Sequence, residues 1–243
     1  MPVDRSGGQR LTSTGRNTRP AWSHDGRYVY FGSDRDGDID IWRRRADLSA
    51  PAEQVLDAPG AQLPSRAAND GQWLLIEQLA PSNADVARLV LAGEPRIEPI
   101  VATIADEFNA DLSSDGRFVC FQSDETGRWD VHVIELATGR RWIVSTGDAY
   151  TPLWSRDGRH ILFVSGEELM SVTVSTEPEF SASEPVAAFR QDVRRHGQTY
   201  DTTADGSRML IGSVEETADR TQENRARVMV VLNWTAELAR RLR

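Results

Sequence analysis

The sequence predicts an all-β fold built from five copies of a short-strand repeat, and two observations support this prediction. An Asp-Gly turn recurs at intervals of 42 to 48 residues, with its glycine at Gly26, Gly71, Gly116, Gly158 and Gly206. Each turn is followed by an apolar segment, and several of these segments carry apolar residues at consecutive positions. Consecutive apolar positions are typical of strands covered on both faces. A period of forty-odd residues made of short strands indicates a β-propeller with one four-stranded blade per repeat.

The first repeat shows how each blade is expected to form. Residues 20–22 are the innermost strand, and Asp25-Gly26 is a hairpin turn in which glycine supplies the positive φ. Its other strands are residues 28–32, 39–42 and 54–56. The same register places second strands at 73–76, 118–121, 160–164 and 209–211, third strands at 86–91, 129–133, 169–172 and 228–232, and fourth strands at 99–101, 142–144 and 186–189. The predicted repeats are 20–56, 64–101, 109–144, 151–189 and 199–232, in a single domain of residues 1–243.

A ring of five blades is expected rather than one of six, and the two ends of the chain suggest how it would close. Residues 9–12 read as a strand with no partner before it, and the last repeat has no fourth strand. We therefore expect residues 9–12 to complete the last blade, which removes two exposed sheet edges. Trp234, Leu238 and Leu242 are spaced four apart, so residues 234–242 are expected to form a short C-terminal helix.

Composition narrows the classes of partner. The formal net charge is −9, which disfavours nucleic acid as a partner because nucleic-acid binders usually carry a basic patch. The sequence has no apolar run long enough for a membrane span or a secretion signal, so a complete chain is expected to be cytoplasmic. A monomer is expected rather than an oligomer. The single cysteine, Cys120, lies in an apolar strand, where a buried thiol is expected.

Several segments resemble a known family. Residues 20–42, PAWSHDGRYVYFGSDRDGDIDIW, resemble the TolB-like, WD-type propeller repeat. Residues 168–174, 176–182 and 231–238 resemble the C-terminal propeller of bacterial serine/threonine kinases that carry a TolB-like region. The kinase motifs, a Gly-rich loop, a catalytic-loop Asp and Asp-Phe-Gly, do not occur in this sequence. The resemblance therefore implies a sensory or docking propeller, and kinase activity does not carry over.

One acidic turn raises the question of a metal site. Residues 33–40 alternate acidic side chains across a tight turn. A calcium-binding EF-hand loop places its glycine at position six and a glutamate at position twelve. Counted from Asp34, Gly37 falls at position four and Arg45 at position twelve. The stretch is therefore interpreted as a solvated hairpin, and the sequence predicts no metal and no cofactor.

The loops expected on one face of the propeller supply the candidate binding residues. These loops precede each innermost strand or join the second strand to the third. Their candidates are Asp34, Asp36, Asp106, Glu107, Phe108, Asp124, Glu125, Asp148, Tyr150 and Tyr200. An acidic face with a few aromatic rings suits a basic peptide, a cationic protein patch or a polar small molecule. The alternative is that these charges only keep the protein soluble.

The leading hypothesis from the sequence is a non-enzymatic propeller that binds a protein or senses a ligand. The rival hypothesis is a propeller enzyme of the lactonase, glycosidase or lyase type, with its site in the central channel. Propellers host both classes, so the fold alone does not separate them. An enzyme would need several carboxylates or histidines that converge on one point.

Overall fold

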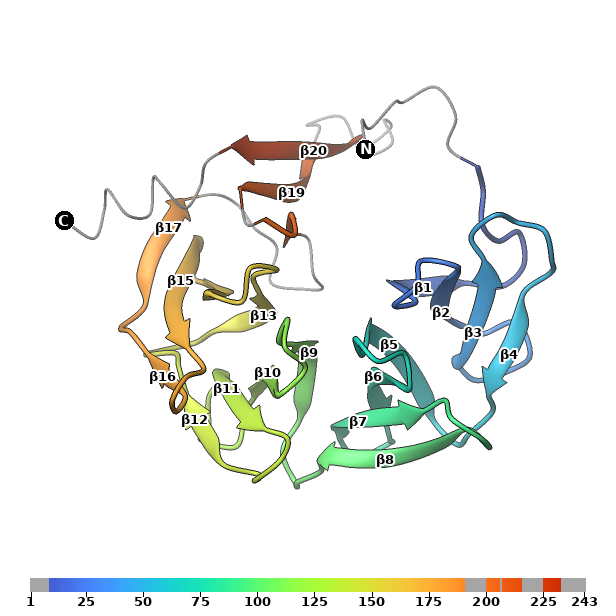
Figure 1. Cartoon of the computed structure of the whole chain (residues 1–243), viewed down its shortest axis with the longest axis horizontal. Helices are drawn as coiled ribbons and strands as arrows, with labels where there is room; N and C mark the ends of the chain where they lie inside the picture. The colour runs from blue at the N-terminus through green and yellow to red at the C-terminus, as the bar shows by residue number, and fades with distance from the viewer. Residues whose placement is uncertain (1–8, 191–199, 206, 216–224, 233–243) are drawn as a thin grey trace. The chain divides into compact units, whose positions relative to one another are not determined.

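The computed structural model describes residues 9–190, 200–205, 207–215 and 225–232. Within these ranges all regular secondary structure is β, in twenty strands (Figure 1). No helix long and apolar enough to cross a membrane occurs in the part of the chain that is described.

The strands form five antiparallel sheets, and strands that follow one another in the sequence pair within each sheet. The first sheet contains β1 (Asn17–Trp22), β2 (Tyr28–Ser33), β3 (Asp40–Arg45) and β4 (Glu53–Leu56). The second contains β5 (Ala61–Ala67), β6 (Trp73–Leu79), β7 (Ala84–Val90) and β8 (Arg96–Val101). The third contains β9 (Glu107–Leu112), β10 (Phe118–Ser123), β11 (Asp130–Glu135) and β12 (Arg141–Ile143).

The remaining two sheets depart from the four-stranded pattern. The fourth contains β13 (Tyr150–Trp154), β14 (His160–Ser165), β15 (Glu168–Ser175) and β16 (Ser181–Ala182), and β17 (Val186–Arg190) also pairs with β15. The fifth contains β18 (Tyr200–Thr202), β19 (Arg208–Glu215) and β20 (Arg225–Leu232). The sheets thus follow the predicted repeats, and the extra strand β16 was not predicted.

The chain divides into two compact units. Unit 1 consists of residues 1–82 and 87–99, and holds the first sheet and most of the second. Unit 2 consists of residues 83–86 and 100–243, and holds the third, fourth and fifth sheets. The single domain over residues 1–243 stays a prediction.

The Asp-Gly turns have the predicted backbone. The φ angles of Gly26, Gly71, Gly116 and Gly158 lie between 68° and 74°, in the left-handed region that favours glycine. In the third sheet the hydroxyl of Ser113 donates to Asp115 at 2.6 Å, and the N–H of Phe118 donates to the same hydroxyl at 3.0 Å. The N–H of Arg117 donates to Asp115 at 3.0 Å. These bonds fix the hairpin before the apolar strand begins.

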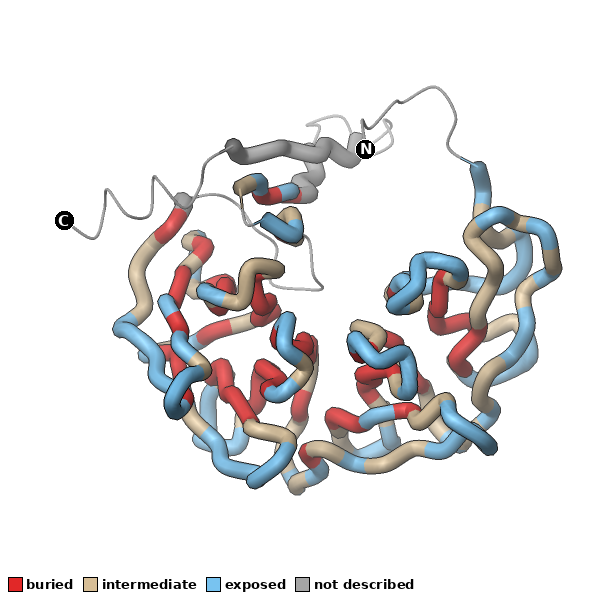
Figure 2. Tube along the Cα trace, in the orientation of Figure 1, coloured by how far each residue is buried: buried red, intermediate tan, exposed pale blue. Residues whose placement is uncertain are grey.

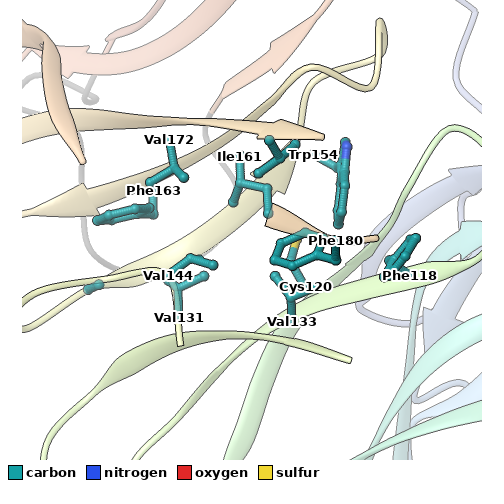
Figure 3. Close-up of a cluster of buried hydrophobic side chains, with 12 residues drawn as sticks. Phe118, Cys120, Val131, Val133, Val144, Trp154, Ile161, Phe163, Val172 and Phe180 are labelled. Atoms are coloured by element: carbon teal, nitrogen blue, oxygen red, sulfur yellow. The ribbon is translucent and has the colours of Figure 1, made fainter. Parts of the chain in front are cut away.

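Buried residues concentrate on the second and third strands of the sheets and, in unit 2, also on the innermost strands β9 and β13, whereas the outer strands β4, β8 and β12 are more exposed (Figure 2). In unit 1, Tyr30, Leu74, Ile76 and Leu89 belong to one apolar cluster. In unit 2, Phe118, Trp154 and Phe180 belong to a larger cluster, which also includes side chains of β10, β11, β14 and β15 (Figure 3). Apolar contact between successive sheets is therefore the main source of stability within each unit.

The innermost strands carry a repeated irregularity. The pairing of β1 with β2, of β9 with β10 and of β13 with β14 shifts register at a β-bulge. Arg19, Asn109 and Thr151 lie at these bulges with φ of 50° or 51°. A non-glycine residue in this region is strained and needs surrounding interactions to hold it.

The predicted closure of the last sheet needs correction. Residues 9–12 form no strand, so the expected closing strand is wrong, and the fifth sheet has three described strands. The carbonyl of Leu11 instead accepts a hydrogen bond of 2.6 Å from the guanidinium of Arg44 in the first sheet. Residues 9–12 are thus held by a side-chain hydrogen bond to the first sheet and not by the expected backbone pairing with the last sheet. The expected helix over residues 234–242 lies outside the described residues.

Candidate functional site

Two of the predicted binding residues lie in unit 1. The carboxylate of Asp34 accepts a hydrogen bond of 2.7 Å from the N–H of Arg16, so it holds the loop that precedes β1. Asp36 is exposed and lines a hollow of about 420 Å³ together with Asp38, Asp40 and Asp57. Burial raises the pKa of Asp40, and the charges of Asp57 and Asp38 raise it further.

In unit 2, Asp106 and Asp124 repeat the contact made by Asp34. The N–H of Asp106 donates to the carboxylate of Asp124 at 3.0 Å, and the carboxylate of Asp106 accepts from the N–H of Ala84 at 3.0 Å. In both sheets an aspartate after the second strand therefore binds the loop that leads into the first strand. This use of the carboxylate is structural.

Two predicted residues are buried and so are not available on an exposed face. Glu107 is fully buried and accepts a hydrogen bond of 2.5 Å from the hydroxyl of Thr103. Burial raises the pKa of Glu107, and its Oε2 atom has no hydrogen-bond partner. Tyr200 is 4% exposed, and its hydroxyl donates to the carbonyl of Thr151. Burial raises the pKa of the Tyr200 phenol.

The predicted aromatic residues Phe108 and Tyr150 flank a third ring that the sequence analysis did not select. The ring of Trp129 lies 6.0 Å from that of Phe108 and 6.4 Å from that of Tyr150, measured between centroids. The N–H of Ala149 donates to the carbonyl of Trp129 at 2.9 Å, which joins the two loops. All three rings are partly exposed. They form a continuous row that spans the third and fourth sheets.

Carboxylates are close to this row in the sequence. Asp148 is exposed and lies two residues before Tyr150, and Asp106 lies two residues before Phe108. Glu125 lies four residues before Trp129, in the same loop. We call the row and these acids, Phe108, Trp129, Tyr150, Asp106, Glu125 and Asp148, the acidic aromatic surface.

Glu125 is the acid of this surface with the most side-chain contacts. Its carboxylate lies 3.3 Å from Nδ1 of His132 and 3.3 Å from Nη1 of Arg141. His132 is 1% exposed and stacks on Phe121, with 5.4 Å between ring centroids. Burial lowers the pKa of His132, and the charge of Glu125 offsets part of this effect.

A second feature missed from the sequence is the set of polar contacts at the β-bulges. In unit 2 the side-chain amide of Gln122 accepts bonds from Asn109 Nδ2 at 3.0 Å and from the N–H of Thr151 at 2.8 Å. In unit 1 the guanidinium of Arg19 lies 3.3 Å from the buried carboxylate of Glu77. Glu77 and Gln122 hold the same position in their strands, four residues after the first residue of β6 and of β10. The sequence signal that could have identified these contacts was a polar residue, Glu77 or Gln122, within an otherwise apolar strand.

The described residues contain no group of three or more His, Cys, Asp or Glu side chains arranged to hold a metal ion.

Comparisons with known proteins identify the fold. The structure of TolB from Acinetobacter baumannii superposes with a TM-score of 0.64 at 14% identity, over 90% of this chain and 52% of that chain. A putative TolB from Agrobacterium tumefaciens gives a TM-score of 0.62 at 18% identity, over 90% of this chain and 78% of that one. The fold is a TolB-like β-propeller. Its repeats are the five sheets described above.

Other comparisons add enzymes with this propeller fold and one short sequence match. An oligogalacturonate lyase in complex with manganese has a TM-score of 0.51 at 12% identity, over 92% of this chain and 76% of that chain. An uncharacterized Agrobacterium fabrum protein is 44% identical over 59 residues, which cover 24% of this chain and 20% of that protein. No protein-family model matches the sequence. TolB-like propellers thus occur in enzymes and in other proteins.

Proposed function

We propose that the chain is a non-enzymatic TolB-like propeller that binds a basic segment of a partner polypeptide through the acidic aromatic surface. The observation that carries this proposal is the row of partly exposed rings of Phe108, Trp129 and Tyr150. In this proposal the propeller acts as a monomer and uses no cofactor.

The chemistry of the row favours binding. Tryptophan and tyrosine are enriched among the residues that contribute most to protein interfaces, because they bury a large area at low entropic cost. Arginine and lysine side chains stack on such rings, at about 0.5–1 kcal/mol for an exposed contact. The carboxylates of Asp148 and Glu125 would pair with the same cations. The net charge of −9 would also speed the approach of a basic partner.

The resemblance to kinase-associated propellers extends this proposal. In such a protein the propeller would serve as the docking or sensing part of a longer chain. The present chain spans about half the length of the Acinetobacter baumannii TolB structure that it matches. We propose this link to kinase-associated propellers only from the resemblance of residues 168–174, 176–182 and 231–238.

Selection from a random library of twelve-residue peptides tests the proposed binding. Wild-type protein is the target, and Trp129→Ala is used for counter-selection. We expect the selected peptides to be rich in arginine and lysine, and to bind Trp129→Ala at least tenfold more weakly than wild type. Trp22→Ala is the matched control, because Trp22 is 62% exposed in unit 1 and lies outside the acidic aromatic surface. Peptides without basic residues, or equal losses in both variants, would refute the proposal.

A propeller enzyme is the second candidate, and Glu107 is the observation that favours it. A buried carboxyl with a raised pKa and an unpartnered oxygen has the properties of an acid catalyst. A thermal-shift screen of lactones, oligosaccharides and divalent metal ions tests this candidate. A ligand that stabilises the wild type but not Glu107→Gln would support the enzyme. The absence of any such ligand would favour the binding module.

A further inference from the structure

Unit 1 contains a cavity of about 300 Å³ between the first and second sheets. Its wall includes the side chains of Tyr28 and Tyr30 on β2, Arg43 on β3 and Ala67 on β5. His24 and Asp70, from two successive Asp-Gly turns, also line it. This volume is at the lower end of the range for small-molecule sites.

The hydrogen bond that closes each Asp-Gly turn identifies equivalent positions in different sheets, and these positions locate the corresponding space in unit 2. The N–H of Ser23 donates to the carbonyl of Tyr28 at 2.9 Å, and the N–H of Ser113 donates to that of Phe118 at 2.9 Å. Tyr28 and Phe118 therefore hold the same position, one at the start of β2 and the other at the start of β10.

Ala67 and Trp154 are equivalent by the same criterion. Each is the last residue of an innermost strand and directly precedes the residue that closes the turn. The closing bonds run from Ala68 to Trp73 at 2.9 Å and from Ser155 to His160 at 2.8 Å. The position occupied by the methyl side chain of Ala67 in unit 1 is thus occupied by the indole of Trp154 in unit 2.

In unit 2 this indole fills the space (Figure 3). Trp154 is fully buried, and its ring stacks on Phe118 with 6.1 Å between centroids and 30° between planes. Phe180, in the connection before β16, packs on the same ring of Phe118 at 5.5 Å. In the second sheet the connection over residues 91–95 has no aromatic residue. The cavity in unit 1 is therefore the place where two aromatic rings lie in unit 2.

The polar groups of the cavity restrict the charge of a ligand. The guanidinium of Arg43 lies 4.7 Å above the ring of Tyr28, and its Nε donates to Glu53 at 2.6 Å. An anion gains little from Arg43, because Arg43 is already paired with Glu53, and a cation gains little from Asp25, which also lines the cavity, because Asp25 is already paired with Arg27 at 3.6 Å. A neutral ring satisfies both conditions. The carboxylate of Asp70 at the rim can accept a hydrogen bond from a ring N–H.

We propose that this cavity binds a neutral, planar aromatic molecule of indole size, whose ring takes the place that Trp154 occupies in unit 2. The ring would lie against Tyr28 and next to Ala67. This site is in unit 1 and is independent of the acidic aromatic surface.

Indole itself is the probe, and saturation-transfer NMR with a titration gives the affinity. Ala67→Trp supplies the ring covalently, so indole should bind at least tenfold more weakly while the Tm stays equal to or above that of the wild type. Ala67→Leu is a second blocking variant, because Leu112 holds the equivalent position in β9 and is fully buried. Ala137→Trp adds the same side chain at an exposed site in unit 2 and should leave indole binding unchanged.

Two results would overturn the proposal. One is the absence of indole binding to the wild type up to millimolar concentration. The other is a folded Ala67→Trp or Ala67→Leu variant that binds indole with wild-type affinity. If Ala67→Trp fails to fold, the comparison between Ala67→Leu and Ala137→Trp decides the question.

Discussion

The Asp-Gly turns show what a few neighbouring residues can determine. In the first, third and fourth sheets a serine hydroxyl donates to an aspartate two residues later, at 2.6 to 2.7 Å. The same hydroxyl accepts the N–H of the residue five positions on. All partners lie within one turn, so the motif could be predicted from the sequence alone. The second sheet has Ala68 in place of the serine and keeps only the backbone bond to Asp70.

Asp115→Ala tests how much such a turn contributes. The variant loses bonds from Ser113 and Arg117, at a cost of about 1 kcal/mol in the free energy of unfolding. For a chain of this size we expect the Tm at pH 7 to fall by about 2–4 °C. Asp36→Ala, at an exposed position, is the control and should leave the Tm unchanged.

The pH dependence of this difference follows from the pKa of Asp115. Burial alone would raise that pKa, but hydrogen bonds from Ser113 and Arg117 outweigh burial and lower it. The aspartate therefore stabilises the fold above its unfolded pKa of 3.8, and the contribution is lost as the pH falls through the lower native value. The Tm difference between wild type and Asp115→Ala should shrink below pH 3.8. A constant difference would contradict this account.

His132 gives a second pH prediction. Burial lowers its pKa below the unfolded value of 6.5, so the unfolded chain binds a proton more readily than the native protein. Stability is therefore lost as the pH falls below 6.5. His132→Phe keeps the stack on Phe121 and should flatten the fall in Tm between pH 7 and pH 5. An unchanged slope would mean that His132 does not control this range.

The burial of single residues was the least predictable feature of the candidate site. Glu107 and Tyr200 were selected because their loops were expected on the binding face, yet both are buried. Their burial depends on which neighbouring sheet covers them, and no local pattern encodes that. Trp129 was passed over because the sequence analysis placed it in the predicted strand 129–133, whereas β11 begins at Asp130 and Trp129 lies in the preceding loop.

At the scale of strands and sheets, the burial of a residue and its contribution to stability depend on its neighbours. Trp22 and Trp154 both end an innermost strand just before the turn, but Trp22 is 62% exposed and Trp154 is fully buried. The two segments look alike in the sequence, as Trp-Ser-x-Asp-Gly. Trp154 differs from Trp22 in belonging to a buried apolar cluster, in which Phe118 and Phe180 pack on its ring.

Alanine substitutions at these two positions should therefore differ greatly. Trp154→Ala removes a buried ring from the core of unit 2 and should cost about 3–5 kcal/mol in the free energy of unfolding. Trp22→Ala should change it by less than about 0.5 kcal/mol. Urea denaturation of both variants measures the two values. Similar losses would contradict the burial seen in the structure.

The β-bulges were likewise beyond sequence analysis. The repeats predicted where each innermost strand lies, but the register shift at Arg19, Asn109 and Thr151 arises from pairing with the next strand. Gln122 holds two of these bulges through contacts 13 and 29 residues apart in the chain. Such contacts become visible only when the fold is known.

At the scale of the whole molecule, the period of the repeat was sufficient to predict a β-propeller. The period did not predict the closure of the last sheet correctly, because residues 9–12 form no strand and instead bind the first sheet through Arg44. The number of domains is open to a direct test. A single domain predicts one calorimetric transition with equal calorimetric and van't Hoff enthalpies. Two separate transitions would mean that units 1 and 2 unfold independently.

The central claim is that a basic polypeptide binds the acidic aromatic surface, and ¹⁹F NMR of protein labelled with 5-fluorotryptophan tests it most directly. The chain has seven tryptophans, and single Trp→Phe variants assign their signals. On titration with a selected basic peptide, we predict that the Trp129 signal shifts while those of Trp22 and Trp154 do not. Unchanged Trp129 with a shift at Trp22, or no shift at any tryptophan, would contradict the proposed surface.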